Sequence, residues 1–321
     1  MPRDDRKLLT PPTDAELLRV PGVLPENLRN GRNTAAVVRR TVLHEWPLSR
    51  VELAELAELA WPNSAADPGL PVRRVVKSQL CVSSVEAAFY RIAYARGEAR
   101  GEAAEQGRGR ALSDGIRLPG FLGASWSADL ETDWLILSCE EGEPASWDGL
   151  TDEQIRSRVR ELSRAFQVLA DGAPVFTDWS RHERFAADMD RIFPVLLDGE
   201  DGAGLDGASA AELRAWIEGP AGDCWDSPVG LLHGDLKADN LIRTGARETV
   251  VLDWQRPMKA PLPLEEELSL LLENRSPAPA ADPTPFRRLA CLTLCHWYAW
   301  AFRTCLPVPF VRSMAVHYAS L

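Results

Sequence analysis

The chain has 321 residues, 45% of them hydrophobic, so it can bury one large core or two modest ones. Its formal net charge of −11 argues against nucleic acid as a partner, because no basic block is present to neutralise a phosphate backbone. The sequence has no signal-peptide-like segment and no apolar run of about 18 residues, so it predicts neither secretion nor membrane insertion. We therefore expect a cytoplasmic protein with no membrane partner.

The N-terminal third begins with an irregular segment and continues into a strand and a helix. Residues 1–34 are rich in proline, aspartate and arginine, which predicts a loosely held N-terminal extension. Lys77, one of only four lysines, lies in the β-branched run VRRVVKSQL, which predicts a strand. The following SSVEAAFYRIAYARG predicts a helix capped by Ser84, with Glu86 in its first turn. The apolar face expected for this helix consists of Val85, Ala88, Phe89 and Ile92.

A strand pair and a long amphipathic helix are expected next. RLPGFLGAS, residues 117–125, and DLETDWLILSCEEGEP, residues 129–144, predict two strands leading into a polar connector. TDEQIRSRVRELSRAFQVLAD, residues 151–171, predicts a helix that begins with a capping box between Thr151 and Gln154. Its apolar stripe consists of Ile155, Val159, Leu162, Phe166 and Leu169.

The most informative segment is VGLLHGDLKADNLIRTGARETVVLDWQ, residues 229–255. It predicts a strand over 229–232 and then a hairpin of 241–244 with 249–252, closed by the turn GARE. Symmetric pairing would place Asn240 opposite Asp253, with Cβ atoms roughly 4.5–5.5 Å apart. An amide oxygen and a carboxylate would then converge on one ion, and such oxygen ligands suit Mg²⁺. Asp235, on the loop before the hairpin, could accept a proton from a substrate hydroxyl.

HGDLKADN followed by LDWQ resembles the aminoglycoside phosphotransferase and choline kinase-like family, and ADPGLPVRRVVK is similar to its ecdysteroid kinase-like subgroup. The resemblance implies an α+β, protein-kinase-like fold with a small antiparallel-sheet lobe and a larger, mainly helical lobe. It also implies transfer of a phosphoryl group from ATP or GTP to a hydroxyl of a small molecule. Asp235 would be the catalytic base, and Asn240 and Asp253 would bind Mg²⁺.

The resemblance extends to the residues expected to hold the nucleotide. Lys77 matches the strand lysine that contacts phosphates, and Glu86 matches the glutamate that pairs with it. A connector at 138–140, comprising Ser138, Cys139 and Glu140, would lie against the base. The implied lobes are 35–140, with its hinge at 138–140, and 141–321, which would carry the hairpin 229–255. Acceptor-binding residues are expected after the hairpin and in 172–227.

The sequence departs from the family pattern before Lys77. A glycine-rich loop should cover the phosphates there, but residues 35–76 contain only Gly69. By resemblance, AAVVRRTVLHEW and RVELAELAELAW are the first two strands, which leaves residues 46–50, with Ser49, as the loop. VELAELAELA nevertheless favours a helix by propensity and by its leucine spacing of three. A catalytically silent nucleotide- or ligand-binding protein is therefore an alternative.

Two further features of the second half leave alternatives open. A metal-dependent hydrolase could use His233, Asp235 and Asp253, although it would leave Lys77 and Glu86 unexplained. By resemblance, Glu267 is expected to bond back to the catalytic loop; a neighbouring glutamate could take its place.

The six cysteines form no CxxC pair, so we expect them to be reduced. Cys291, Cys295 and His296 lie in the apolar run RRLACLTLCHWYAWAFRT. These surroundings favour a buried terminal helix over a metal site.

Overall fold

The computed structural model describes residues 11–19, 23, 34–46, 48–59, 72–80, 84–99, 109–127, 132–197, 204–245, 247–274 and 284–321. The chain divides into two compact units. The first comprises Met1–Glu143 with Ile242–Leu252, and the second comprises Pro144–Leu241 with Asp253–Leu321. The chain therefore passes from one unit to the other three times, and the strands of the predicted hairpin belong mostly to the first unit.

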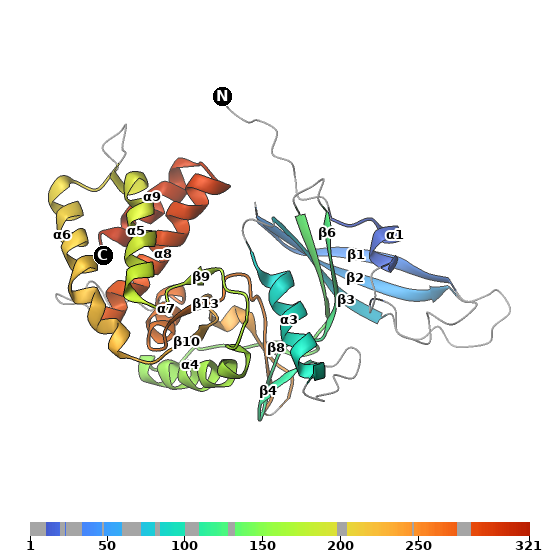
Figure 1. The fold of residues 1–321 in the computed structure, drawn as a ribbon. Coiled ribbons are helices and arrows are strands. Elements are labelled where there is room, and N and C mark those ends of the chain that lie inside the picture. Colours follow the sequence, from blue (N-terminus) through green and yellow to red (C-terminus); the bar gives the residue numbers. More distant parts are fainter. Residues whose placement is uncertain are drawn as a thin grey trace. The chain divides into compact units, whose positions relative to one another are not determined.

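The first unit is built on a five-stranded antiparallel sheet, drawn in blue and green in Figure 1. Its order is β1-β2-β3-β7-β6, so neighbouring strands are mostly neighbours in sequence. Helix α3, Glu86–Ala99, packs against β6 and β7. The strands are β1 (Thr34–Trp46), β2 (Ser49–Leu59), β3 (Val72–Leu80), β6 (Phe121–Ser127) and β7 (Thr132–Ser138).

Strand β2 confirms the family-based prediction over the local helix propensity. It pairs with β1 along its length and with β3 from Ser49 to Leu56. Glu52, Ala54 and Leu56 are buried, whereas the residues between them are only half-buried. This alternation has the period of two that a strand requires. Pairing on both edges therefore outweighs the helix preference of leucine, alanine and glutamate.

The described part of the N-terminal extension is not loosely held. Residues Asp14–Arg19 form helix α1, and Leu17 and Val23 are both fully buried in the core of the first unit. Asp14 accepts from Arg40 Nε of β1 at 2.8 Å, and the Val23 carbonyl accepts from Arg74 Nε at 3.0 Å. The apolar residues of this segment, Leu17 and Val23 among them, follow no regular period, so the sequence did not predict this contact.

Helix α3 forms as predicted, but its buried face differs. Ser84 Oγ accepts from the Glu86 N–H at 3.0 Å, which confirms the expected cap. Phe89 is buried as predicted, whereas Ala88 is exposed. Tyr90 and Tyr94 take the buried positions instead, and both rings contact Phe121 of β6. The buried face is therefore rotated from the predicted one: Tyr90 and Tyr94 contact the sheet, and Ala87 and Ala93 are buried in place of Ala88.

A second five-stranded sheet joins segments far apart in sequence. Its order is β4-β5-β12-β11-β8, and β5 pairs in parallel with β12. The strands are β4 (Ala111–Ser113), β5 (Ile116–Arg117), β8 (Glu143–Pro144), β11 (Leu241–Arg243) and β12 (Thr249–Val251). The predicted hairpin is present as β11 and β12, and the Thr244 N–H donates to the Glu248 carbonyl at 3.1 Å across its turn. This sheet holds the tip of the hairpin in the first unit.

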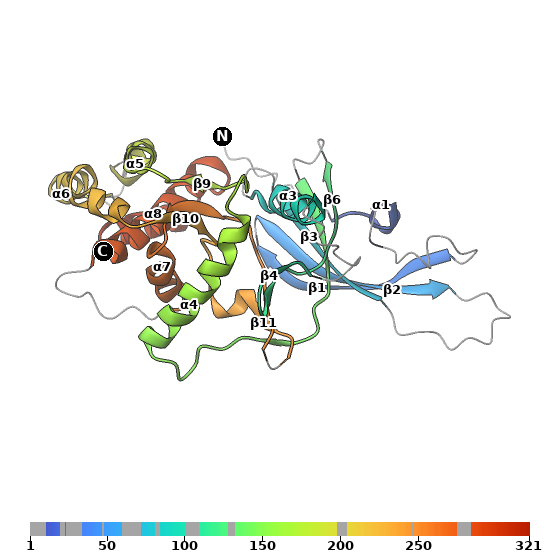
Figure 2. The same ribbon diagram turned by 60° about the horizontal axis from the view of Figure 1, so that its bottom comes forward.

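The second unit is mainly helical and contains the largest hydrophobic core. In it α4 runs beside α7, and α7 beside α8, which also packs on α5 and α9 (Figure 2). A three-stranded sheet, order β10-β13-β9, lies among these helices. The helices are α4 (Asp152–Phe166), α5 (His182–Leu197), α6 (Gly207–Glu218), α7 (Leu264–Leu272), α8 (Pro285–Thr304) and α9 (Pro309–Ala319). The strands are β9 (Thr177–Asp178), β10 (Val229–Leu232) and β13 (Met258–Pro261), and the 3₁₀ turns are η2 (Gln167–Leu169), η3 (Pro220–Asp226) and η4 (Ala238–Asn240).

Helices α4 and α8 confirm their sequence predictions. The capping box between Thr151 and Gln154 is complete, and the whole predicted stripe of α4 is buried. Cys291 and Cys295 of α8 are buried, and both are free thiols.

The described residues include no group of three or more His, Cys, Asp or Glu side chains arranged to hold a metal. Within that same part of the chain, no helix combines the length and hydrophobicity of a membrane span.

Candidate active site

Asp235 follows β10 on a loop whose backbone geometry requires glycine at the preceding position. Gly234 has φ +82°, and a Cβ there would lie 2.4 Å from the Arg256 carbonyl oxygen. A side chain would therefore be both strained and in collision. After Asp235 the chain enters η4, and Asn240 Nδ2 donates to the Asp235 carbonyl at 2.6 Å. The loop thus folds back on itself and brings the side chains of Asp235 and Asn240 together.

His233 supports the loop that carries Asp235. It is fully buried, and its ring lies 4.6 Å from that of Trp254 and 6.2 Å from that of Phe166. The Asp235 N–H donates to His233 Nδ1 at 3.3 Å. A buried imidazole that accepts a backbone bond orients the loop, and this role explains the histidine of the HGD motif without any direct contact with substrate.

Glu265, and not Glu267, bonds back to the catalytic loop. Glu265 is fully buried at the start of α7 and accepts from the backbone N–H groups of His233 at 2.7 Å and Gly234 at 3.1 Å. The predicted Glu267 instead pairs with Arg156 of α4 at 2.9 Å. The helix begins at Leu264, so its first turn presents Glu265 to the loop two residues before the predicted position. Burial raises the pKa of Glu265 to about 8, although the two N–H donors act in the opposite direction.

Asp253 lies close enough to Asp235 for the two carboxylates to interact. Burial raises the pKa of Asp235, and the negative charge of Asp253 raises it further, while Lys237 and Arg256 lower it. Asp253 has φ +65°, a left-handed conformation that is uncommon for residues other than glycine. Such strain persists only where the surroundings enforce it, and it is typical of functional positions. The structure therefore brings Asp235, Asn240 and Asp253 together.

The oxygen atoms of Asn240 and Asp253 suit a magnesium ion. Asn240 Nδ2 is directed to the carbonyl and carboxylate of Asp235, at 2.6 and 3.4 Å, so its amide oxygen is the atom left to bind a cation. Asp253 supplies a carboxylate. Mg²⁺ is commonly held by one or two carboxylates and by the phosphates of its nucleotide, with no complete protein cage. Two protein ligands are thus sufficient for a metal that arrives with a nucleotide.

Lys77 and Glu86 form the ion pair that the sequence predicts. Lys77 Nζ lies 2.7 Å from Glu86 Oε2, and the two side chains are 9% and 1% exposed. Lys77 comes from β3, opposite Val51 and Leu135 of the neighbouring strands, and Glu86 is the first residue of α3. A buried lysine needs such a partner, because an isolated buried charge is costly. The pair fixes the ammonium at a defined position on the sheet.

Ser49 does not lie in a phosphate-binding loop. It is the first residue of β2, is buried, and pairs with Trp46 on one side and Gln79 on the other. β1 ends at Trp46 and β2 begins at Ser49, and these two residues pair with each other, so Ser49 belongs to the sheet and not to the predicted loop of 46–50. The structure therefore does not bring Ser49 to a loop in the way that we predicted.

The connector residues 138–140 are engaged within the first unit. The Ser138 N–H donates to the Gly120 carbonyl, and Ser138 Oγ accepts from the Gly120 N–H at 2.7 Å. Glu140 pairs with Arg117 at 2.7 Å and accepts a short hydrogen bond from Ser138. Cys139 is half-buried, and burial raises the pKa of its thiol. These contacts fix the path of the connector; its role in binding a base stays a prediction.

Two residues around the catalytic loop were missed by the sequence analysis. Glu273, at the end of α7, accepts from the Ala238 N–H at 2.7 Å. Arg256 lies 5.3 Å from the ring of Trp297 and acts electrostatically on Asp235. Glu273 lies 35 residues from its partner, so no local pattern could indicate the contact. Arg256 follows the DW motif closely and could have been considered on that ground.

Comparison with known proteins supports the fold and the family. The phosphotransferase enzyme family (APH) matches residues 28–287. No curated protein is a significant sequence match. A choline/ethanolamine kinase family protein from Mesorhizobium loti has 14% identity and a TM-score of 0.51, covering 95% of this chain and 90% of its own.

Two other structures have a similar sequence identity, TM-score and coverage. Plasmodium vivax ethanolamine kinase has 9% identity and a TM-score of 0.52, covering 88% and 82% of the two chains. The streptomycin–ATP ternary complex of APH(2")-IIa has 12% identity and a TM-score of 0.51, covering 89% and 92%. At such identities these structures show the fold alone, and they confirm the predicted α+β, protein-kinase-like architecture. The ecdysteroid kinase-like subgroup stays a prediction. Since the family match spans more than half of the sequence, the chain belongs to the phosphotransferase enzyme family.

Proposed function

We propose that the protein transfers the terminal phosphoryl group of ATP or GTP to a hydroxyl of a small molecule. The observation that carries this proposal is the cluster of Asp235, Asn240 and Asp253 on a loop held by buried Glu265. A metal-dependent phosphoryl transfer needs one carboxylate to receive a proton and oxygen ligands to hold the ion. This cluster offers both. Membership of the phosphotransferase enzyme family supports the same reaction class.

Asp235 is assigned the role of base. Its carboxylate would accept the proton of the acceptor hydroxyl as the hydroxyl oxygen forms a bond to the terminal phosphorus. The bond from that phosphorus to the bridging oxygen would break, which leaves the nucleoside diphosphate. Burial and Asp253 raise the pKa of Asp235 toward the range in which a carboxylate accepts a proton effectively.

Asn240 and Asp253 are assigned to the metal, and Lys77 to the phosphates. When bound, Mg²⁺ would neutralise charge on the phosphate oxygens. Lys77 would add a second positive charge, and Glu86, at 2.7 Å, would orient it. Ser138, Cys139 and Glu140 are assigned to the nucleotide base through their backbone. No glycine-rich loop takes part, so the assignment places more of the phosphate binding on Lys77 and the metal.

The alternatives have less support. A hydrolase using His233 as a ligand or base requires an accessible imidazole, whereas His233 is fully buried and accepts a backbone hydrogen bond. A catalytically silent nucleotide-binding protein is motivated by the lack of glycine in residues 46–50, which should hold the phosphates. This alternative does not account for the left-handed backbone of Asp253.

The test is transfer of label. Purified protein would be incubated with γ-labelled ATP or GTP, Mg²⁺ and a panel of hydroxylated metabolites and antibiotics, with a metal chelator as the parallel control. We expect Mg²⁺-dependent label in at least one acceptor. Saturable nucleotide binding without transfer to any member of a broad panel would favour the silent nucleotide-binding protein.

A further inference from the structure

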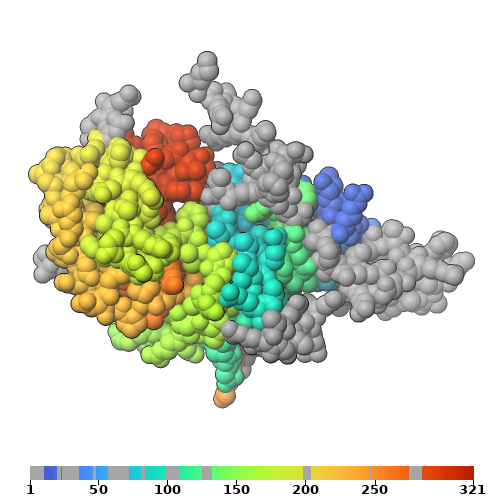
Figure 3. All heavy atoms as spheres, in the orientation of Figure 1, coloured from blue at the N-terminus to red at the C-terminus, as the bar shows by residue number. Residues whose placement is uncertain are grey.

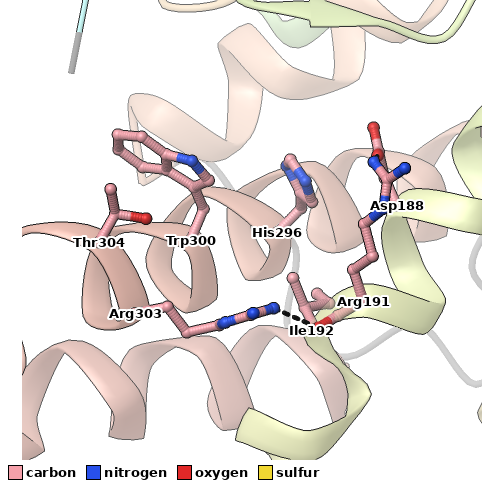
Figure 4. A pocket seen from close by; sticks show the side chains of 7 residues that line it. All are labelled: Asp188, Arg191, Ile192, His296, Trp300, Arg303 and Thr304. Carbon is pink, nitrogen blue, oxygen red and sulfur yellow. Dashed lines mark hydrogen bonds and ion pairs between the residues drawn. The ribbon is translucent and has the colours of Figure 1, made fainter. Parts of the chain in front are cut away.

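A pocket of about 530 Å³ lies between α5 and α8 in the second unit. Figure 3 shows the surface hollowed between the yellow-green α5 and the red C-terminal helices. Ile192 and His296 are its buried part, and Trp300 is half-buried beside them (Figure 4). Arg191 and Arg303 are exposed at its rim. The pocket thus has an apolar, aromatic interior and a charged margin.

The buried part of the pocket carries an unsatisfied polar atom. His296 is 8% exposed, and its Nδ1 has no hydrogen-bond partner among the described residues. Burial lowers the pKa of His296 to about 4, so the ring is neutral at pH 7. Leaving a buried polar atom without a partner is unfavourable, and buried polar atoms almost always have one. This Nδ1 atom is itself closed to solvent, so it belongs to the wall of the pocket and does not face its open space.

The charges at the rim favour an anion over an amine. Asp188 is the acidic residue of the pocket, and both its oxygens already accept hydrogen bonds, one from Arg191 at 2.7 Å and one from Trp179 Nε1 at 3.0 Å. Arg303 uses one nitrogen on the Arg191 carbonyl, across the helices (Figure 4). Each guanidinium has further N–H donors. The lining therefore carries two guanidinium groups against one carboxylate, and that carboxylate is already paired with Arg191.

The acidic residues of α7 do not add a free negative charge that would favour a cationic ligand. Glu265 accepts from the catalytic loop, while Glu266 and Glu267 pair with Arg160 and Arg156 at 3.4 and 2.9 Å. Each of these carboxylates thus has a partner within the second unit. The cationic acceptor that the acidic net charge could suggest finds no free carboxylate at these positions.

Trp300 connects the pocket to the catalytic loop. Its ring packs edge-on against Phe176 at 5.0 Å, and the Phe176 N–H donates to the Pro257 carbonyl at 2.7 Å. Arg256, the preceding residue, acts electrostatically on Asp235. One helical turn earlier, Trp297 lies 3.4 Å from where a Cβ on Gly234 would be. The aromatic face of α8 therefore runs from the pocket to the loop that carries Asp235.

We infer that this pocket binds the acceptor, and that the acceptor is a planar, ring-bearing molecule with a carboxylate or similar anionic group and not a polycationic amine. This inference rests on the proposed function. The ring would stack on Trp300, and the anionic group would take the free donors of Arg191 and Arg303. Arginine is well suited to this role because its planar donors match a carboxylate.

The test compares two probes that share a hydroxymethyl-substituted ring and carry opposite charges. Isothermal titration calorimetry would measure binding of 4-(hydroxymethyl)benzoate and 4-(hydroxymethyl)benzylamine to the full chain. We expect the carboxylate to bind about tenfold more tightly or better, the usual effect of a charge-assisted hydrogen bond. Arg191→Gln and Arg303→Gln should each reduce this preference severalfold. Arg158→Gln, at a half-buried arginine of α4 that pairs with Glu161, is the matched control and should preserve it.

Three outcomes would overturn the inference: preference for the amine, absence of saturable carboxylate binding, or a preference that survives both rim substitutions. None of them requires phosphoryl transfer, so the label-transfer assay reports separately on the proposed function. Transfer to a polycationic acceptor together with amine preference would leave the kinase activity standing and remove this pocket assignment. Carboxylate preference that is lost only in the rim variants would support the pocket, even where no transfer is detected.

Discussion

The strained backbone of Asp253 separates this residue from an ordinary surface aspartate. Its φ of +65° requires support from its surroundings, and the carboxylate lies near Asp235. The sequence pattern DW, together with HGD and the downstream asparagine, was sufficient to predict that these residues meet. The left-handed backbone itself could not be predicted, because it depends on how the chain crosses from β12 into the second unit.

We predict that Asn240→Ala and Asp253→Asn each weaken Mg²⁺-dependent nucleotide binding. The double variant should lose less binding free energy than the two single variants lose together. The reason is that both residues serve one ion, so the second loss removes little that is still formed. Asparagine is chosen at 253 because it tolerates a positive φ. Titrations of nucleotide at fixed Mg²⁺ would measure the three affinities. Strict additivity would mean that the two residues act at separate sites.

A second prediction at the residue scale concerns the shape of the positively charged group at position 77. Lys77→Arg should reduce kcat/KM for the nucleotide, because a planar guanidinium cannot replace a compact ammonium held 2.7 Å from buried Glu86. Arg73→Lys is the matched control on the same strand, since Arg73 is half-exposed and 3.8 Å from Glu55. Steady-state kinetics would compare the two variants. Unchanged kinetics in a folded Lys77→Arg protein would show that Lys77 does not contact phosphate.

At the scale of elements, patterns with a short range were read correctly and long-range contacts were not. The capping box of α4 involves two residues three positions apart, and it formed as predicted. The brace on the catalytic loop joins residues more than 30 positions apart, and the sequence placed it at Glu267 instead of Glu265. Adjacent glutamates are indistinguishable by type, so only the start and rotation of α7 decide which one is buried.

Glu265→Gln should lower the free energy of unfolding by about 1–3 kcal/mol, measured at pH 5. The amide offers a single acceptor oxygen, so one of the two backbone N–H groups that Glu265 satisfies loses its partner. Glu267→Gln is the matched control on the same helix. Its ion pair with Arg156 is partly exposed, so it should cost less, about 1 kcal/mol or below. Denaturant melts that showed the larger loss at Glu267 would contradict the brace.

The same residue predicts a pH dependence. Because burial raises the pKa of Glu265 from 4.5 to about 8, the folded state holds a proton that the unfolded state releases. The contribution of this carboxyl to stability is therefore full below pH 4.5, decreases as the pH rises to about 8, and is then constant. Subtracting the stability curve of Glu265→Gln isolates this contribution. A difference curve that rises with pH would mean that the carboxyl is ionised in the fold.

At the scale of the whole molecule, the family resemblance predicted more than local propensity could. It made AAVVRRTVLHEW and RVELAELAELAW the first two strands, the second against its helix propensity, and both strands are present as β1 and β2. It also led us to expect a loop over 46–50, whereas Trp46 and Ser49 pair with each other as the ends of β1 and β2. The pocket that we assign to the acceptor could not be predicted from the sequence, because it depends on how α5 and α8 pack together.

Label transfer by Asp235→Asn compared with Asp239→Asn tests the central claim most directly. Asp239 is exposed on the same loop, so it controls for general effects of removing a carboxylate there. With labelled nucleotide, Mg²⁺ and an acceptor that the wild-type protein phosphorylates, Asp235→Asn should transfer about 10²–10⁴-fold more slowly. It should still bind nucleotide, because Asn240 and Asp253 remain, and Asp239→Asn should match the wild type. Full transfer activity in a folded Asp235→Asn protein would contradict the account.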